Sequence, residues 1–217
     1  DTIFTDLFRI PRYQAELVNT LSPGLNAKAE DIKLMTLNYV MLNESYNDFG
    51  AVVKDKLLFC SEAQSTWSLN ILFRLFLYAA NTYQKYIDEL KDFDIYSVKK
   101  QKLPILDCSV IYCGKEKNLP QYINLNKDFF DGKSPLDLKV KVLNRAGKEN
   151  IVEEYISFCH IFDEQVKLYG YTKKTVEETI KICSNENILR EYMKAKEKEV
   201  HDIMYSLFDE EEIQKRH

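Results

Sequence analysis

The chain has 217 residues, of which 45% are hydrophobic and 29% charged, and its formal net charge at pH 7 is -4. This length can bury one substantial core with an appended helical part, and the acidic balance argues against a broad nucleic-acid surface. No apolar run approaches the ~20 residues that span a bilayer and the first residues show no secretion leader, so we expect a soluble cytoplasmic protein that makes no contact with membranes.

The first part of the chain alternates helical and strand patterns. Pro11 interrupts an amphipathic pattern, and the turn-forming residues 22–24 stop it. Apolar residues then alternate with polar ones over 31–38 and 48–64, which indicates strands, and they return to helical spacing from residue 69 onward. The elements expected in this part are helices over 3–8 and 12–21, a strand over 31–38, a strand hairpin over 48–64 and a long helix over 69–90.

The pattern of the second part predicts strands first and helices alone from residue 149 onward. Gly114 and Gly132 mark turns between the strands. A hairpin, a long helix and a returning apolar strand fit a mixed sheet flanked by helices, so the fold class is α/β. We place the sheet-containing core in residues 1–145 and a helical C-terminal region in 146–217. The expected elements are strands over 104–112 and 137–143 and helical stripes over 151–169, 176–183 and 189–207.

The expected hairpin carries two carboxylates at its open end. Its alternating runs flank the charged residues 54–56, the short polar connection that a hairpin favours. With the middle residue of this turn at the tip, Asp48 lies opposite Glu62. A two-residue turn at 55–56 would instead oppose Asp48 to Ala63 and turn the carboxylates to different faces.

Two opposed carboxylates need a neutralising partner. Directly opposed side chains on one sheet face lie ~5 Å apart, where like charges destabilise the sheet. A divalent cation between Asp48 and Glu62 would neutralise them, and Gln64, two residues beyond Glu62, shares that face. The alternative is that both acids are polar residues at the open end of a hairpin. The apolar residues 57–60 before Glu62 count against it, because an unpaired buried carboxylate is costly.

Several sequence words stand in order along nearly the whole chain. They are DTIFTDLF (1–8), ND (47–48), DKLLFCSEAQSTWS (55–68), NILFRLFLYAANTY (70–83), KLP (102–104) and FDEEE (208–212). With these words the chain resembles the recombination-promoting nuclease (Rpn) and putative-transposase family of bacterial PD-(D/E)XK nucleases. The match is specific because it depends on several ordered words.

The resemblance implies a PD-(D/E)XK core, a mixed sheet flanked by helices, that cleaves DNA in connection with recombination or transposition. It implies that Asp48 and Glu62 hold Mg²⁺ or Mn²⁺ and that Gln64 completes the catalytic set. Glutamine replaces the usual lysine of the superfamily, and a neutral amide can only hydrogen-bond where an ammonium also supplies charge. The alternative is therefore an inactive nuclease fold kept as a nucleic-acid-binding or assembly protein.

The helix that follows the hairpin carries further candidates. Arg74 and Tyr78 are four residues apart, so they are neighbours on one helix face. They resemble a glutamine and tyrosine pair that related nucleases carry behind the active strand. We expect Arg74 and Tyr78 to take part in nucleic-acid binding, where Arg74 could hold a backbone phosphate. The alternative for Arg74 is a salt bridge, for instance to Glu62. Trp67 could stack on a base, although such a residue more often caps the core where a strand meets a helix.

A local basic segment follows the long helix. Lys99, Lys100 and Lys102 lie close together in the sequence, and Lys91 precedes them. They are the best candidates for a DNA-binding surface, with Lys99 and Lys100 at its centre. The alternative is a solvated loop whose lysines keep the chain soluble.

The remaining features concern the helices and cysteines. Glu16 on the second helix is a candidate third carboxylate, because some members of the superfamily use an acid from their first helix. Four acids at 209–212 close the last helix, where the helix dipole disfavours them, so this end should fray or bind a basic partner. A protein partner on the C-terminal helices and self-association both stay open.

The five cysteines include no C-x-x-C pair, and we expect most of them to be reduced core residues.

Overall fold

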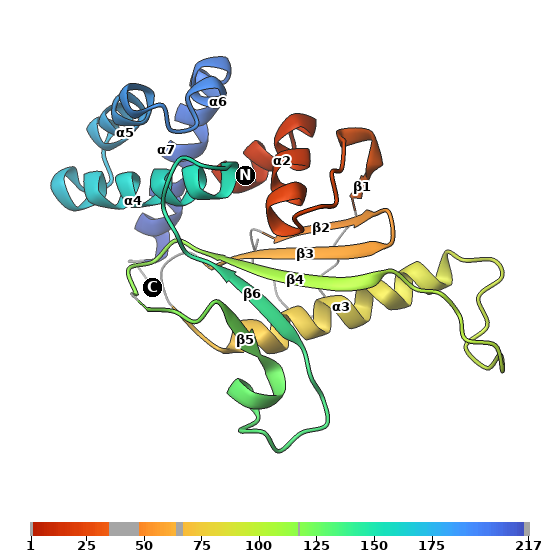
Figure 1. The fold of residues 1–217 in the computed structure, drawn as a ribbon. Helices are drawn as coiled ribbons and strands as arrows, with labels where there is room; N and C mark the ends of the chain where they lie inside the picture. Colours follow the sequence, from red (N-terminus) through yellow and green to blue (C-terminus); the bar gives the residue numbers. More distant parts are fainter. Residues whose placement is uncertain (1, 35–47, 64–66, 117, 215–217) are drawn as a thin grey trace. The chain divides into compact units, whose positions relative to one another are not determined.

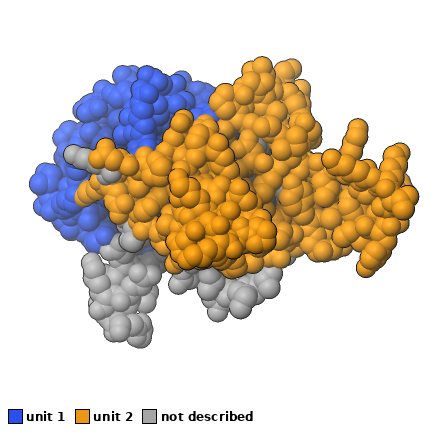
Figure 2. Space-filling model, turned by 60° about the horizontal axis from the view of Figure 1, so that its bottom comes forward, with its two compact units in different colours: residues 1–20, 144–217 blue, residues 21–143 orange. Residues whose placement is uncertain are grey.

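The chain forms two compact units, one built on a sheet and one built of helices. The computed structural model describes residues 2–34, 48–63, 67–116 and 118–214, with 48, 57–63, 207 and 209–214 described by their backbone alone. The sheet unit comprises residues 21–143, and the helical unit comprises 1–20 and 144–217 (Figure 2). The N-terminal helices therefore belong with the C-terminal ones, whereas the sequence placed them in the core with the sheet.

The sheet unit contains a six-stranded mixed sheet in the order β1-β2-β3-β4-β6-β5 (Figure 1). The first three strands form an antiparallel meander, β4 and β6 add in parallel, and β5 closes the edge antiparallel to β6. This confirms the expected α/β class with a mixed sheet. The strands are β1 (Ile32–Leu34), β2 (Asp48–Val53), β3 (Lys56–Ala63), β4 (Ile105–Tyr112), β5 (Tyr122–Asn124) and β6 (Lys139–Leu143).

The parallel pair β3 and β4 organises this unit. The two strands pair over their whole length, from Lys56 opposite Ile105 to Ala63 opposite Tyr112. Parallel neighbours need a long crossover, and here helix α3 (Asn70–Asp88) and the loop after it make the connection. Consecutive residues of β4 from Cys108 to Tyr112 are buried, as expected of a strand covered on both faces.

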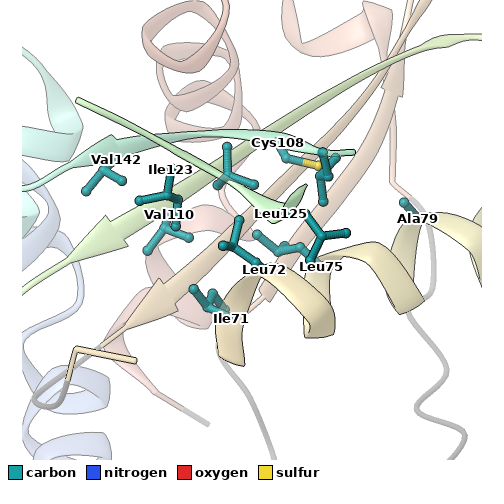
Figure 3. Packing of buried hydrophobic residues seen from close by; sticks show 11 residues of the cluster. Ile71, Leu72, Leu75, Ala79, Cys108, Val110, Ile123, Leu125 and Val142 are labelled. Atoms are coloured by element: carbon teal, nitrogen blue, oxygen red, sulfur yellow. The ribbon is translucent and has the colours of Figure 1, made fainter. Parts of the chain in front are cut away.

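Helix α3 packs its apolar stripe on one face of the sheet (Figure 3). Ile71, Leu72, Leu75 and Ala79 are buried there, within a cluster that includes Val110 of β4. The remaining members of the cluster are Cys108, Ile123, Leu125, Leu138, Val140 and Val142. Leu125 begins a one-turn helix, η2 (Leu125–Phe129), that the sequence did not suggest.

The buried face of α3 differs from the expected one. The spacing of apolar residues along the helix predicts a buried stripe that includes Phe73 and Ala80. In the structure Phe73 is 38% exposed, and Ala80 is exposed as well. Apolar residues lie nearly all around α3, so spacing alone does not choose which of them face the sheet. The observed stripe is rotated toward Ile71 and Leu75.

The helical unit has a buried apolar core, and helix caps and a buried polar network add to it. Asn150 caps α4 by accepting from the backbone N–H groups of Val152 and Glu153, each at 3.1 Å. Glu154 accepts from the backbone N–H of Leu189 at 2.7 Å, and burial raises the pKa of this carboxyl. The helices are α1 (Ile3–Phe8), α2 (Pro11–Leu21), α4 (Ile151–Tyr169), α5 (Lys173–Glu186), α6 (Arg190–Ala195) and α7 (Glu197–Gln214).

Asp6 joins the N-terminal helices to the C-terminal ones. Its Oδ2 accepts from the Tyr192 hydroxyl at 2.8 Å, and its Oδ1 contacts Lys196 Nζ at 2.8 Å. Asp6 and Tyr192 are buried, and burial together with the Asp6 hydrogen bond raises the pKa of Tyr192. A buried carboxylate with a cation and a hydroxyl donor is satisfied, so α1 is fixed to α6 by a long-range polar contact.

None of the described helices combines the length and the apolar character needed to cross a bilayer.

We predict that Tyr192→Phe lowers the free energy of unfolding by about 1–2 kcal/mol, because it removes a buried hydrogen bond to a charged acceptor. Urea unfolding followed by circular dichroism measures the change. Tyr122→Phe is the matched control, since Tyr122 is 43% exposed on β5. Equal stability of the Tyr192 variant and the parent would show that the hydrogen bond from Tyr192 to Asp6 does not stabilise the fold.

Candidate functional site

The turn of the β2–β3 hairpin differs from both expected turns. Val53 pairs with Lys56, so the turn consists of Lys54 and Asp55 alone. Lys54 adopts the left-handed conformation with φ 55°, as tight hairpin turns require at their first central position. Lysine seldom adopts this conformation, and the sequence therefore gave no signal for it.

The register follows from this turn and corrects the expected opposition of the two carboxylates. Asp48 pairs with Ser61, one residue short of Glu62. The expectation that Asp48 lies directly opposite Glu62 is wrong, and so is the alternative of Ala63. In an ideal pleat, a shift of one residue also changes the face of the sheet. Repulsion between directly opposed carboxylates therefore gives no reason for a shared cation, and the metal role of both acids stays a prediction from the family resemblance.

The backbones of the two acidic residues nevertheless meet at the open end of the hairpin. Asp48 is the first residue of β2, and Glu62 is the next residue after its partner Ser61. Two strands of an antiparallel pair lie ~5 Å apart. Gln64 lies outside the described residues. The backbone therefore brings residues 48 and 62 together, while the side chains of both lie outside what the structure describes.

The start of helix α3 lies at the same end of the sheet. Arg74 stands one turn into α3, half-buried, with its Nε shielded from solvent. Tyr78 packs against the core cluster, one turn further along the same face. Trp67 also packs on that cluster, with its ring 5.4 Å from the Tyr112 ring in edge-to-face geometry. Trp67 is thus a core residue, as its position between strand and helix suggested.

The lysines lie at the other end of the sheet. Lys99 and Lys100 precede Ile105, which pairs with Lys56 at the start of β3. Six positions along β3 separate Lys56 from Glu62, about 20 Å of strand. The structure therefore does not bring Lys99 and Lys100 together with residues 48 and 62. If they bind DNA, they bind a part of it remote from the hairpin end.

One polar cluster in the sheet was missed by sequence reasoning. Asp107 Oδ2 contacts Lys56 Nζ and accepts from Ser22 Oγ, both at 3.1 Å. An acid within the apolar run of β4 was the only sequence signal for it. Because Lys56 neutralises this carboxylate, the cluster stabilises the start of β3 and β4, at the opposite end of the sheet from Glu62.

Other candidate groups have structural roles where the structure describes them. Glu16 forms an ion pair with Arg12 of its own helix at 3.1 Å, in the helical unit. Burial raises the pKa of the Cys108 thiol and of the Cys183 thiol to about 12, which keeps both protonated and unreactive. Among the side chains that the structure describes, no group of three or more His, Cys, Asp or Glu could hold a metal ion.

Comparisons with protein-family models, with curated proteins and with solved structures found no match to this chain.

The register itself can be tested with paired cysteines. Val53 and Lys56 close the turn as a hydrogen-bonded pair, and alternation along the ladder makes Asp48 and Ser61 a non-hydrogen-bonded pair with close Cα atoms. We predict that Asp48→Cys with Ser61→Cys, in a Cys60→Ala background, forms a disulfide on mild oxidation.

The matched control is Asp48→Cys with Glu62→Cys in the same background, which should remain reduced. Peptide mapping under non-reducing conditions identifies the crosslink. A crosslink between residues 48 and 62 in preference to 48 and 61 would contradict the register and restore the directly opposed carboxylates.

Proposed function

We propose that the protein is a divalent-metal-dependent DNA endonuclease of the PD-(D/E)XK type. The observation that carries the proposal is the placement of two acids from the family words at one hairpin end: Asp48 begins β2 and Glu62 follows its cross-strand partner. The ordered words of the family resemblance support the same assignment. The mixed sheet with a crossover helix and a returning parallel strand suits the fold that this resemblance implies.

The donor chemistry at this end suits a hard cation. Mg²⁺ and Mn²⁺ prefer carboxylate oxygens, and Mg²⁺ commonly uses one or two carboxylates together with waters and phosphate oxygens. Asp48 and Glu62 would supply the two carboxylates. When bound, the ion would lower the pKa of a water and offset negative charge on the scissile phosphate.

The chain's own residues have distinct roles in this proposal. Gln64 would orient the attacking water through its amide, which can donate and accept hydrogen bonds. Arg74, at the adjacent start of α3, would hold a phosphate oxygen, since a guanidinium offers paired donors in a fixed plane. Its shielded Nε limits the contact to the terminal nitrogens.

The second candidate function is a nuclease fold without catalysis that binds DNA or assembles with other proteins. The feature that favours it is Gln64, which stands where the superfamily usually has lysine. Without an ammonium in that position, less positive charge would face the developing charge of the reaction. The two functions differ in how cleavage responds to residue 64.

We expect the purified protein to nick or cut plasmid DNA with Mg²⁺ or Mn²⁺ and to stop on addition of EDTA. Glu62→Gln and Asp48→Asn should each reduce cleavage strongly, because each removes a charged oxygen ligand of the kind that Mg²⁺ and Mn²⁺ prefer. Circular dichroism checks that the variants remain folded. Glu30→Gln is a control at an acid that is exposed in the same unit. If both variants cut DNA as well as the parent does, the cleavage comes from another site on the protein or from a contaminant.

Residue 64 separates the two functions. In the endonuclease, Gln64→Lys should maintain or raise cleavage, because the acids beside it favour a protonated lysine, whereas Gln64→Ala should lower it sharply. The same gel assay gives the rates. The binding protein would be supported instead if the parent, Gln64→Lys and Gln64→Ala all bind DNA and none of them cuts it with any divalent metal.

A further inference from the structure

A loop between α3 and β4, residues 89–104, extends beyond the ends of both elements and away from the sheet (Figure 1). We call it the arm. The end of the arm is fixed where it reaches β4, because the Tyr83 hydroxyl of α3 donates to the carbonyl of Pro104 at 2.5 Å. Next to it, the backbone N–H of Ile105 donates to the carbonyl of Asp55 at 2.6 Å. The arm therefore projects from a fixed base.

The tip of the arm is a hydrogen-bonded turn. The Asp94 carboxylate accepts from the backbone N–H of Tyr96 at 2.8 Å, and the Asp94 carbonyl accepts from the N–H of Ser97 at 3.1 Å. This pairing is an Asx turn within a β-turn, a common device for fixing a short connection. The tip is thus ordered by its own contacts.

The ordered tip presents apolar side chains to water. Ile95 is 71% exposed, Tyr96 93% exposed and Val98 fully exposed. Turn residues are usually polar or small, so three large apolar side chains around one turn are unusual. A cluster of exposed apolar groups on an ordered projection is typical of a surface that binds a partner.

The basic side chains beside the tip indicate which partner. Lys99, Lys100 and Lys102 are exposed, and no carboxylate of a described residue lies within ion-pair distance of them. Lysines are depleted from the centres of protein interfaces but suit nucleic-acid phosphates. Three lysines next to the acids Asp92 and Asp94 also fall short of the larger basic cluster that anionic lipids attract.

We propose that the arm binds DNA with unpaired bases: Tyr96 stacks on an exposed base while Lys99 and Lys100 contact the adjacent phosphates. Aromatic side chains next to basic residues bind single strands in this way, because every unpaired base offers a π face, whereas a duplex buries those faces. The proposal rests on the proposed endonuclease function and narrows its substrate to DNA that contains a single-stranded segment.

The arm would act as a remote anchor. Its base lies about 20 Å along the strands from residue 62, so its contacts with a bound strand are remote from the proposed cleavage site. An anchor that does not reach the scissile phosphate strengthens binding of substrate and transition state equally. Loss of the anchor should therefore raise KM and leave kcat unchanged.

Fluorescence anisotropy in EDTA tests the arm apart from cleavage, with a labelled strand of about 20 nucleotides, longer than the arm-to-hairpin span, and its duplex. The parent should bind the single strand more tightly than the duplex. Tyr96→Ala should weaken binding to the single strand roughly tenfold, the effect of losing one base stack, and Tyr96→Phe should bind as the parent does. The logarithm of the binding constant falls linearly with the logarithm of the salt concentration, with a slope of about -0.7 per phosphate contact on a single strand. Changing Lys99 and Lys100 together to Ala should therefore make this slope less negative by about 1.4.

Tyr122→Ala is the matched control at an exposed tyrosine on β5, and it should bind as the parent does. Equal affinity of the Tyr96→Ala variant and the parent for the single strand would overturn the proposal. So would Tyr96-dependent binding to phosphatidylglycerol vesicles with no change in DNA affinity, which would make the arm a membrane contact.

The outcome for the arm is independent of the outcome for catalysis. A parent that binds single strands through Tyr96 but cuts no DNA with Mg²⁺ or Mn²⁺ would retain the arm and refute the endonuclease. A parent that cuts DNA while the arm variants bind and cut equally well would refute the arm and retain the endonuclease.

Discussion

The parallel pairing of β3 with β4 is the constraint on which the sheet unit depends. Because parallel neighbours must start at the same end of the sheet, the chain has to return along the whole length of β3 before β4 can begin. Helix α3 makes that return, and its buried stripe covers the sheet face that would otherwise be exposed. The same return places the end of β3 and the start of α3 at one end, and the arm at the other.

The two ends of the sheet have different chemistry as a result. At one end the backbones of Asp48 and Glu62 meet, with Arg74 one turn into the adjacent helix. At the other end Lys56 neutralises Asp107, and the arm presents Tyr96 and its lysines to solvent. A protein that cuts at the first end and holds an unpaired strand at the second would need no broad basic surface, which agrees with its net charge of -4.

Much of the fold was predictable because its patterns are local. The alternation around residues 48–63 and the long apolar helix that follows specify the hairpin and α3, and the structure confirms both. The register was not predictable, because it depends on Lys54 in the left-handed conformation. Few lysines adopt this conformation. The buried face of α3 was equally ambiguous, since apolar residues lie all around it.

Long-range contacts account for the other differences from the expected fold. The N-terminal helices join the C-terminal ones through Asp6, Tyr192 and Lys196, and nothing local to residues 1–20 specifies that partnership. Similarly, the sequence identified Lys99 and Lys100 as basic but could not show that they lie about 20 Å along the sheet from Glu62. For the candidate site, the ordered words identify the residue types, whereas the cross-strand partner of Asp48 depends on the turn conformation.

The most direct test of metal-dependent catalysis at the hairpin end is anomalous diffraction from crystals soaked in Mn²⁺. We expect one strong anomalous peak within coordination distance of carboxylate oxygens of both Asp48 and Glu62, because Mn²⁺ favours carboxylate ligands. A hairpin end without Mn²⁺, while the ion occupies other carboxylates on the same molecule, would contradict the assignment and favour a DNA-binding protein without catalysis.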